Sequence, residues 1–335
     1  MDDFMKKTFT TSRGLTYTYY SFPSSETKPV LLLQHGFPDD HELWSNIVPY
    51  IKDLGFPIVV PDLLGYGETS KPSDAWLYNS KGMAGDLMEI IDHEGYTWVI
   101  SVGHDWGSTL AQRLALWHPD RIVSLIILNI PYRPPAQFDV EEANKLSIQT
   151  TGLPRLAYQQ FFVSPGARQV IEDHLETAFH VLHGNDEGTK NYMEDVLCHH
   201  RVLEATLRND TRQPLKTYAK TPGFKEKWIA RMKRDGLEGP LNWYHALHSN
   251  YHWAVEKDLP TERHRLNIPV LFIGATMDAV GLTQAIFVPQ KAGLLPDLTV
   301  KEIESGHWQT FEAPEKGGPI IRKFLQDKVL KAYSS

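Results

Sequence analysis

The chain has 335 residues, 41% of them hydrophobic, enough for a substantial core in one large domain with an insertion or in two domains. Its net charge of −7, from 34 Lys and Arg against 41 Asp and Glu, argues against nucleic acid or an anionic membrane surface as a partner. No apolar run has the length of a signal peptide or a membrane span, and the single cysteine, Cys198, allows no intramolecular disulfide. We therefore expect a soluble, cytoplasmic protein without a membrane anchor.

The first 130 residues alternate between strand and helix patterns. Short apolar runs, typical of strands buried on both faces, are separated by amphipathic segments. The predicted strands are 15–22, 30–34, 57–61, 97–102 and 122–128, and the predicted helices are 42–54, 81–94 and 108–119. This alternation predicts an α/β fold with a mostly parallel central sheet and helices on both faces.

Strand patterns stop at about Pro131 and return near the C-terminal end. The Pro-dense segment "PYRPPAQF" leaves the sheet, and the residues after it, including 188–207, have helical patterns and no convincing strand. Strands are predicted again at 267–278 and 298–303, and helices at 282–293 and 315–333. We interpret 1–130 and 249–335 as one core domain and 131–248 as an inserted helical cap domain.

The sequence "GHDWG" at 103–107 lies between a predicted buried strand and a predicted helix. A Gly-x-nucleophile-x-Gly sequence in that position is typical of a nucleophile elbow, a tight turn that projects its central side chain from the end of the sheet. The central residue is Asp105, whose ionised carboxylate is favoured at a helix N-terminus. Because a carboxylate attacks saturated carbon to form an ester, Asp105 predicts substrates such as epoxides or carbon–halogen compounds.

Two later residues complete a set of nucleophile, acid and base. Asp278 directly follows a predicted strand, and His307 follows the last predicted strand. Nucleophile, acid and histidine occur in this chain order in elbow enzymes. We expect Asp278 to orient His307, and His307 to activate the water that hydrolyses the Asp105 ester.

A second turn, "HGFP" at 35–38, directly follows the strand predicted at 30–34. Such a turn can present a backbone N–H toward the elbow, and the residue after the nucleophile supplies another. We therefore expect the N–H groups of Phe37 and Trp106 to form an oxyanion hole. The Phe37–Pro38 bond is a candidate cis peptide.

These motifs resemble those of the α/β-hydrolase-fold epoxide hydrolases of the soluble type. "HGFP", "GHDWG", Asp278, "GHW" at 306–308 and "LNIPY" at 128–132 fall where that family has its equivalents, and the resemblance spans nearly the whole chain. It implies two cap tyrosines that hydrogen-bond the epoxide oxygen and donate a proton as the ring opens. They are Tyr244 in "PLNWYHA" and Tyr158 in "RLAYQQFFVSPG".

The resemblance also implies the reaction and its partners. A small-molecule epoxide and water would give a vicinal diol, without a cofactor or a metal, in a monomer or homodimer. Two positions depart from the family pattern. His245 follows Tyr244 where arginine is often found, and Asp39 follows "HGFP" where glutamate is frequent. These departures bear on substrate preference more than on mechanism.

Dehalogenation is the nearest alternative, because haloalkane and haloacetate dehalogenases share the aspartate elbow and the Asp–His pair. Many haloalkane enzymes have a halide-binding asparagine where this chain has Phe37. The haloacetate enzymes have carboxylate-binding arginines where this chain has Trp106 and Thr109. Both comparisons favour the epoxide.

Two further alternatives belong to other classes of protein. A non-catalytic receptor can have the same fold, but a nucleophile, an acid and a base are all present in this chain. A metalloenzyme is suggested by His245, His248 and His252, which have helical spacing. They lack an acidic or cysteine partner at the spacing of a zinc site.

Overall fold

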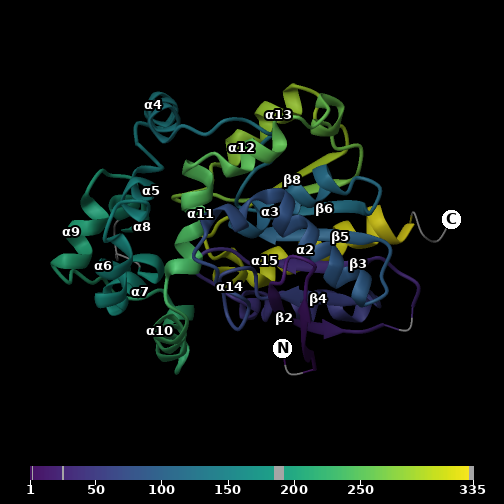
Figure 1. The fold of residues 1–335 in the computed structure, drawn as a ribbon, viewed down its shortest axis with the longest axis horizontal. Coiled ribbons are helices and arrows are strands. Elements are labelled where there is room, and N and C mark those ends of the chain that lie inside the picture. The colour runs from purple at the N-terminus through teal and green to yellow at the C-terminus, as the bar shows by residue number, and fades with distance from the viewer. Residues whose placement is uncertain (2, 25, 185–191, 332–335) are drawn as a thin grey trace.

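The computed structural model describes residues 1, 3–24, 26–184 and 192–331, and its strands form an eight-stranded sheet (Figure 1). The strand order is β1-β2-β4-β3-β5-β6-β7-β8. β2 pairs antiparallel with β1 and β4, and every other neighbouring pair is parallel, so the predicted mostly parallel sheet is confirmed. The strands are β1 Met5–Thr10, β2 Thr16–Phe22, β3 Val30–Gln34, β4 Ile58–Pro61, β5 Val99–His104, β6 Ile122–Leu128, β7 Val270–Ala275 and β8 Leu298–Ile303.

The central strands form the core of the sheet. All residues of β3, β4, β5 and β7 are buried, which matches the continuous apolar runs from which these strands were predicted. α3 (Trp106–Trp117) packs along β5 and β6 and against α2 (Ser80–His93), while α15 (Pro314–Phe324) packs on β7 and β8 and meets α1 (Val48–Ile51). This arrangement places the carboxyl ends of the parallel strands at one edge of the sheet.

The first strand, β1, was missed by the sequence analysis. It pairs with β2 from Met5 opposite Ser21 to Thr10 opposite Thr16 and forms the edge of the sheet. Its sequence "MKKTFT" contains two lysines and no buried residue. Charged side chains are common on edge strands, where they discourage pairing with other chains, so an apolar pattern is absent there.

The helices follow the predicted pattern, but several predicted helices are divided. The prediction 282–293 is a 3-10 turn at Thr283–Ile286 and α13 (Phe287–Lys291), and the prediction 315–333 is α15 (Pro314–Phe324) and a π-helical turn at Leu325–Leu330, with its last two residues outside the described ones. The predicted helix 42–54 is a 3-10 turn at His41–Trp44, the short α1 at Val48–Ile51 and a second 3-10 turn at Lys52–Leu54. α1 begins with Pro49 in its first turn, where the missing N–H needs no partner. The other helices are α2 Ser80–His93, α3 Trp106–Trp117, α4 Val140–Thr151, α5 Ala157–Phe162, α6 Ala167–Asp173, α7 Leu175–His183, α8 Tyr192–Leu197, α9 Val202–Arg208, α10 Phe224–Asp235, α11 Glu238–His248, α12 Tyr251–Glu256, α13 Phe287–Lys291, α14 Gln309–Glu312 and α15 Pro314–Phe324.

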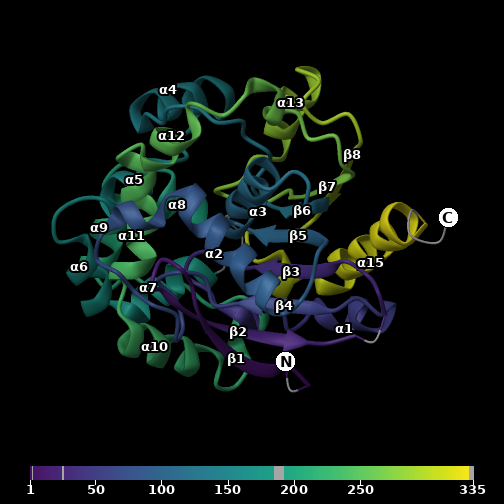
Figure 2. The same ribbon diagram turned by 45° about the vertical axis from the view of Figure 1, so that its right-hand side comes forward.

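The segment between β6 and β7 is helical. α5 to α10 lie together to the left of the sheet in both views (Figures 1 and 2), and in Figure 1 α11 lies between them and the sheet. The predicted segment 188–207 begins outside the described residues, and its described part forms α8 and α9. The domain boundaries at 131 and 248 stay a prediction. No helix formed by the described residues is both long and apolar enough to cross a bilayer.

A buried ion pair joins the end of this segment to the sheet region. Arg113 of α3 donates from Nε to Glu256 of α12 at 2.8 Å, and from Nη1 to the carbonyl of Arg133 at 2.7 Å. The Ser80 hydroxyl of α2 also donates to Glu256. Both charged residues are buried, so each depends on the other for the interactions it loses with water.

Replacing one partner of this pair should therefore cost more than replacing both. We expect Arg113→Met to lower the free energy of unfolding by about 3–5 kcal/mol, because it leaves the Glu256 carboxylate buried and unpaired. The double variant Arg113→Met, Glu256→Gln should recover a large part of that loss. Urea unfolding measures both, and a double variant no more stable than Arg113→Met would contradict this account.

Candidate active site

Asp105 occupies the sharp turn between β5 and α3. Its backbone, with φ 54° and ψ −122°, has a conformation that costs a non-glycine residue about 1–3 kcal/mol. The flanking glycines allow the turn, because a Cβ at Gly103 would collide with the carbonyl of Gly107, and one at Gly107 with that of Gln34. The turn therefore has the geometry of a nucleophile elbow.

Of the two predicted oxyanion donors, Phe37 contacts the Asp105 carboxyl group directly. Its N–H donates to Asp105 Oδ1 at 2.9 Å, and the N–H of Trp106, the next residue after Asp105, is among the groups that oppose the rise in the pKa of this carboxyl group. Gly36 permits the approach, since a Cβ there would collide with the Asp105 side chain. The Phe37–Pro38 bond is cis. The structure thus brings the two backbone donors and the carboxyl group together.

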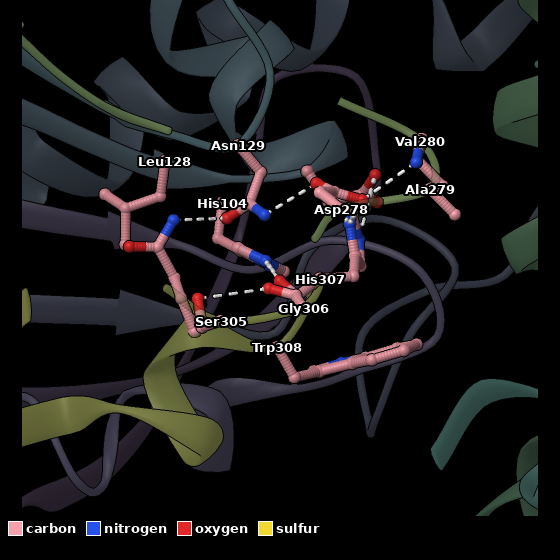
Figure 3. Close-up of polar contacts among 12 residues, drawn as sticks. His104, Leu128, Asn129, Asp278, Ala279, Val280, Ser305, Gly306, His307 and Trp308 are labelled. Carbon is pink, nitrogen blue, oxygen red and sulfur yellow. Dashed lines mark hydrogen bonds and ion pairs between the residues drawn. The ribbon is translucent and has the colours of Figure 1, made fainter. Parts of the chain in front are cut away.

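His307 and Asp278 form a hydrogen-bonded pair beside the elbow (Figure 3). Nδ1 of His307, in the loop after β8, lies 3.0 Å from each carboxylate oxygen of Asp278, which follows β7. Asp278 also accepts hydrogen bonds from Asn129 Nδ2 at 2.6 Å and from the N–H of Val280 at 2.8 Å. These contacts hold the Asp278 carboxylate so that its partner ring has one orientation.

The other ring nitrogen of His307 faces the elbow. Nε2 lies 3.6 Å from Asp105 Oδ2, and all three side chains are buried. His104, directly before the nucleophile, contacts the carbonyl of His307 through Nε2 at 2.8 Å. Because a carbonyl only accepts, His104 Nε2 carries the hydrogen. The His307 ring therefore lies between the predicted nucleophile, Asp105, and the predicted acid, Asp278.

Burial and mutual charge shift the pKa values of this set. Burial raises the pKa of Asp105, although His307 and the two backbone N–H groups oppose it. Burial alone would lower the pKa of His307, but the carboxylates of Asp278 and Asp105 raise it to about 9. Burial would raise the pKa of Asp278, yet His307 and Asn129 hold it below its usual value. Near neutral pH the set therefore holds an imidazolium between two carboxylates.

The two predicted tyrosines are buried next to the elbow. Tyr158 of α5 and Tyr244 of α11 have ring centroids 6.1 Å apart in an edge-to-face arrangement. The Tyr244 ring also lies 5.2 Å from Trp106 and 5.4 Å from Phe37. Burial is the main cause that raises the pKa of both phenols, and the charge of Asp105 adds to it. Both phenols are therefore neutral and close enough to Asp105 to be affected by its charge.

Cations from the helical segment reach two of the loops that carry the site. Arg231 of α10 donates to the carbonyl of Pro38 at 2.9 Å and forms an ion pair with Asp40, so it holds the loop of Phe37. Arg155 donates to the carbonyl of Ala279 at 3.0 Å, directly after Asp278. The loops after β3 and β7 are thus held from the opposite side of the site.

A third cation, Lys216, holds the histidine loop through an acidic residue. Lys216 lies 2.9 Å from Glu312, and Glu312 accepts from the N–H groups of Gly306 at 2.8 Å and Trp308 at 3.2 Å. These two N–H groups flank His307. The helical segment therefore contributes to the position of the base as well as to the two tyrosines.

The sequence analysis missed these supporting residues. Asn129 had a usable signal, because it is a polar residue directly after a buried strand and inside the quoted "LNIPY". Arg155, Arg231 and Lys216 had none. Their partners lie 96 to 193 positions away along the chain, and only the packing of the helical segment brings them together.

His245, His248 and His252 were considered as metal ligands, and two of them have other neighbours. His248 lies 3.2 Å from the amide oxygen of Gln159, and the His252 ring is 6.3 Å from that of Trp106. In the described part of the chain, no three His, Cys, Asp or Glu side chains are grouped as metal ligands would be.

The chain is similar to known proteins in sequence and in structure. A family model described as alpha/beta hydrolase fold matches residues 29–314. A mouse protein named bifunctional epoxide hydrolase 2 is 28% identical over 305 residues, which are 90% of this chain and 52% of that protein. Epoxide hydrolase B of Mycobacterium tuberculosis is 26% identical over 337 residues, which cover 90% of this chain and 93% of that protein. The chain thus spans about half the length of the first curated relatives it matches.

A solved structure has a similar backbone along nearly all of the chain. The crystal structure of epoxide hydrolase A from Mycobacterium thermoresistibile has a TM-score of 0.79 and 22% identity, and the match covers 97% of this chain and 98% of that one. At this identity the likeness concerns the fold. Because the family model matches most of the sequence, including the elbow, Asp278 and His307, the chain belongs to the alpha/beta hydrolase fold family.

Proposed function

We propose that the protein is an epoxide hydrolase that converts an epoxide and water into a vicinal diol through an ester on Asp105. The observation that carries the proposal is the pair of buried phenols, Tyr158 and Tyr244, beside a carboxylate nucleophile. An alkoxide is a poor leaving group until it is hydrogen-bonded or protonated, whereas a halide needs no proton. The names of the mouse and mycobacterial relatives support the same reaction.

The first step is the attack of Asp105 on an oxirane carbon. Oδ1 is engaged by the N–H of Phe37, so Oδ2 is the oxygen available for the new C–O bond. As the ring C–O bond breaks, the departing oxygen takes a proton from Tyr158 or Tyr244. The product of this step is an alkyl ester on Asp105, with Oδ1 as its carbonyl oxygen.

The second step is hydrolysis of that ester. His307, oriented by Asp278, removes a proton from a water that attacks the ester carbonyl carbon. Negative charge then develops on Oδ1, to which the N–H of Phe37 already donates, and the N–H of Trp106 is the second expected donor. The bond between the carbonyl carbon and Oδ2 breaks, Oδ2 takes the proton that His307 had removed from water, and the diol leaves with Oδ2 as its new oxygen.

The charge of Asp105 couples the two steps. In the free enzyme the Asp105 and Asp278 carboxylates both raise the pKa of His307, to about 9, so the ring is protonated and cannot act as a base. Formation of the neutral ester removes one of these carboxylates, which lowers the pKa of His307. The ring can then lose its proton, which makes good the proton that Tyr158 or Tyr244 gave to the epoxide oxygen, and the base becomes available only after the ester has formed.

The helical segment supplies the substrate side of the site. We propose 131–248 as the cap domain, packed on a core domain of 1–130 and 249–335. A small apolar cavity is lined by Phe37 of the core and by Phe162 and Trp228 of the cap, and the Phe162 ring packs against both tyrosines. Apolar surroundings of this kind beside the phenols support an epoxide with an apolar substituent.

A single turnover in heavy-oxygen water tests the ester directly. With enzyme in excess over styrene oxide, the first diol should contain only ordinary oxygen, because its new oxygen comes from Asp105 and the label enters the carboxylate. Mass spectrometry of the diol measures this. Heavy oxygen in the diol of the first turnover would mean that water attacks the epoxide directly.

Removal of the base should trap the intermediate. We expect His307→Gln to alkylate Asp105 at a measurable rate and to hydrolyse the ester at least ~100-fold more slowly, since a positioned general base contributes about 10²–10⁴-fold. Intact-protein and peptide mass spectrometry should show one substrate mass added to Asp105. The control, Asp105→Asn with His307 retained, should show no adduct. If the wild-type enzyme converts a haloalkane to an alcohol and a halide faster than it hydrolyses styrene oxide, a dehalogenase is favoured instead.

The charge coupling predicts a pH dependence. The rate constant for ester hydrolysis should rise with pH as His307 loses its proton, with a midpoint below the pKa of about 9 that this ring has in the free enzyme. Stopped-flow decay of the preformed ester gives that midpoint, and NMR titration of the His307 ring gives the free-enzyme value. Equal midpoints would show that the Asp105 charge does not control the base.

A further inference from the structure

The Tyr158 hydroxyl is the end of a hydrogen-bonded chain of three side chains. Nε2 of Gln159 donates to the Tyr158 oxygen at 3.2 Å, and Oε1 of the same amide lies 3.2 Å from Nε2 of His248. We propose that Gln159 and His248 are positioning residues, which orient the Tyr158 hydroxyl and stabilise its oxygen while it gives its proton to the epoxide. This inference rests on the proposed function.

The direction of each hydrogen bond follows from the chemistry of the groups. An amide oxygen only accepts, so the contact at Gln159 Oε1 requires a hydrogen on Nε2 of His248. Burial lowers the pKa of His248 to about 4, and the ring is therefore neutral near neutral pH, with one hydrogen to place. Since Oε1 is engaged by His248, the NH₂ group of Gln159 faces Tyr158.

This orientation leaves the phenol hydrogen free. The Tyr158 oxygen accepts from the amide, so its own O–H is not used in that contact and can donate to a substrate oxygen. As the proton leaves, negative charge develops on the phenol oxygen, and a hydrogen bond to a charged group is stronger than one to a neutral group. Burial and the Asp105 charge raise the pKa of Tyr158, and the Gln159 hydrogen bond acts against them.

His248, at the far end of this series of hydrogen bonds, is itself held by its neighbours. The His248 ring packs against the Phe138 ring at 5.1 Å between centroids. Asn250 then fixes Phe138, because its Oδ1 accepts from the Phe138 N–H at 2.7 Å and its Nδ2 donates to the Phe138 carbonyl at 3.0 Å. His248 is therefore held in place by the segment that leads into the helical region.

The arrangement also links the two phenols. His248 lies one helical turn after Tyr244 on α11, so both residues project from neighbouring positions of the same helix. α11 thus supplies one tyrosine itself and supports the tyrosine of α5 through Gln159. A shift of α11 would move Tyr244 and, with His248, the contact that holds Gln159 beside Tyr158.

A substitution that keeps the length of Gln159 and removes its polar atoms tests the proposal. We expect Gln159→Met to lower the single-turnover rate constant for alkylation by styrene oxide roughly ten- to hundredfold, the value of a hydrogen bond to a charged group. Hydrolysis of the preformed ester should keep its wild-type rate, because Tyr158 takes no part in that step. Rapid-quench mass spectrometry of Asp105 gives both constants.

Backgrounds that lack one tyrosine separate positioning from general damage. In Tyr158→Phe the Gln159→Met substitution should have no further effect on alkylation, whereas in Tyr244→Phe it should keep its full effect. His248→Gln can still donate an amide hydrogen to Gln159 and should retain most of the rate, while His248→Phe should not. Thermal unfolding checks that each variant is folded.

If Gln159→Met slows alkylation equally in the Tyr158→Phe enzyme and in the wild type, the proposal is overturned, because Gln159 would then act on packing alone. An unchanged or faster alkylation in Gln159→Met would overturn it too, since the amide would be accepting the phenol hydrogen instead of freeing it. Failure of the proposed function has a different signature. In that case wild-type enzyme forms no ester on Asp105 with styrene oxide.

Discussion

The close approach of three backbone segments at the end of the sheet is the constraint on which the site depends. The loop after β3, the end of β5 and the first turn of α3 meet at Gly36, Gly103 and Gly107, where no side chain fits. The surrounding parallel sheet holds this contact and keeps Asp105 in its unfavourable backbone conformation. Because the turn is rigid, the carboxyl group meets the N–H of Phe37 before any substrate is present, and the cost of ordering it is met during folding.

The charges of Asp105, Asp278 and His307 bear on the order of the two proposed reaction steps. Two buried carboxylates, Asp105 and Asp278, face the two nitrogens of one imidazole, and the charge of that ring stabilises both in addition to their own hydrogen bonds. The neutral phenols of Tyr158 and Tyr244 lie next to this charged set. A nucleophile that loses its charge when it reacts changes the pKa values of the titratable groups around it. In the proposed mechanism one histidine is therefore a counter-ion first and a base afterwards.

The sequence predicted those features that depend on local pattern. Asp105, Asp278 and the loop of Phe37 each follow a buried apolar strand, and parallel strands bring their carboxyl ends to one edge, so their proximity could be expected. The edge strand β1 has no such pattern, because its lysines face water. The contact of His248 with Gln159 spans 89 positions and depends on how α5 packs against α11. No local sequence pattern encodes that packing. The resemblance to a family pointed to the two tyrosines but not to Gln159 and His248, which contact one another beside Tyr158.

The cations of the helical segment give that segment a second role. Arg231, Arg155 and Lys216 each end at a different loop of the site, and two of them require an acidic partner, Asp40 or Glu312, on the core. The segment is therefore not a freely exchangeable module. During divergence of the family, another helical segment could replace this one only together with matching charges on the loops. Small substitutions within the existing segment that leave these cations in place are the easier evolutionary route.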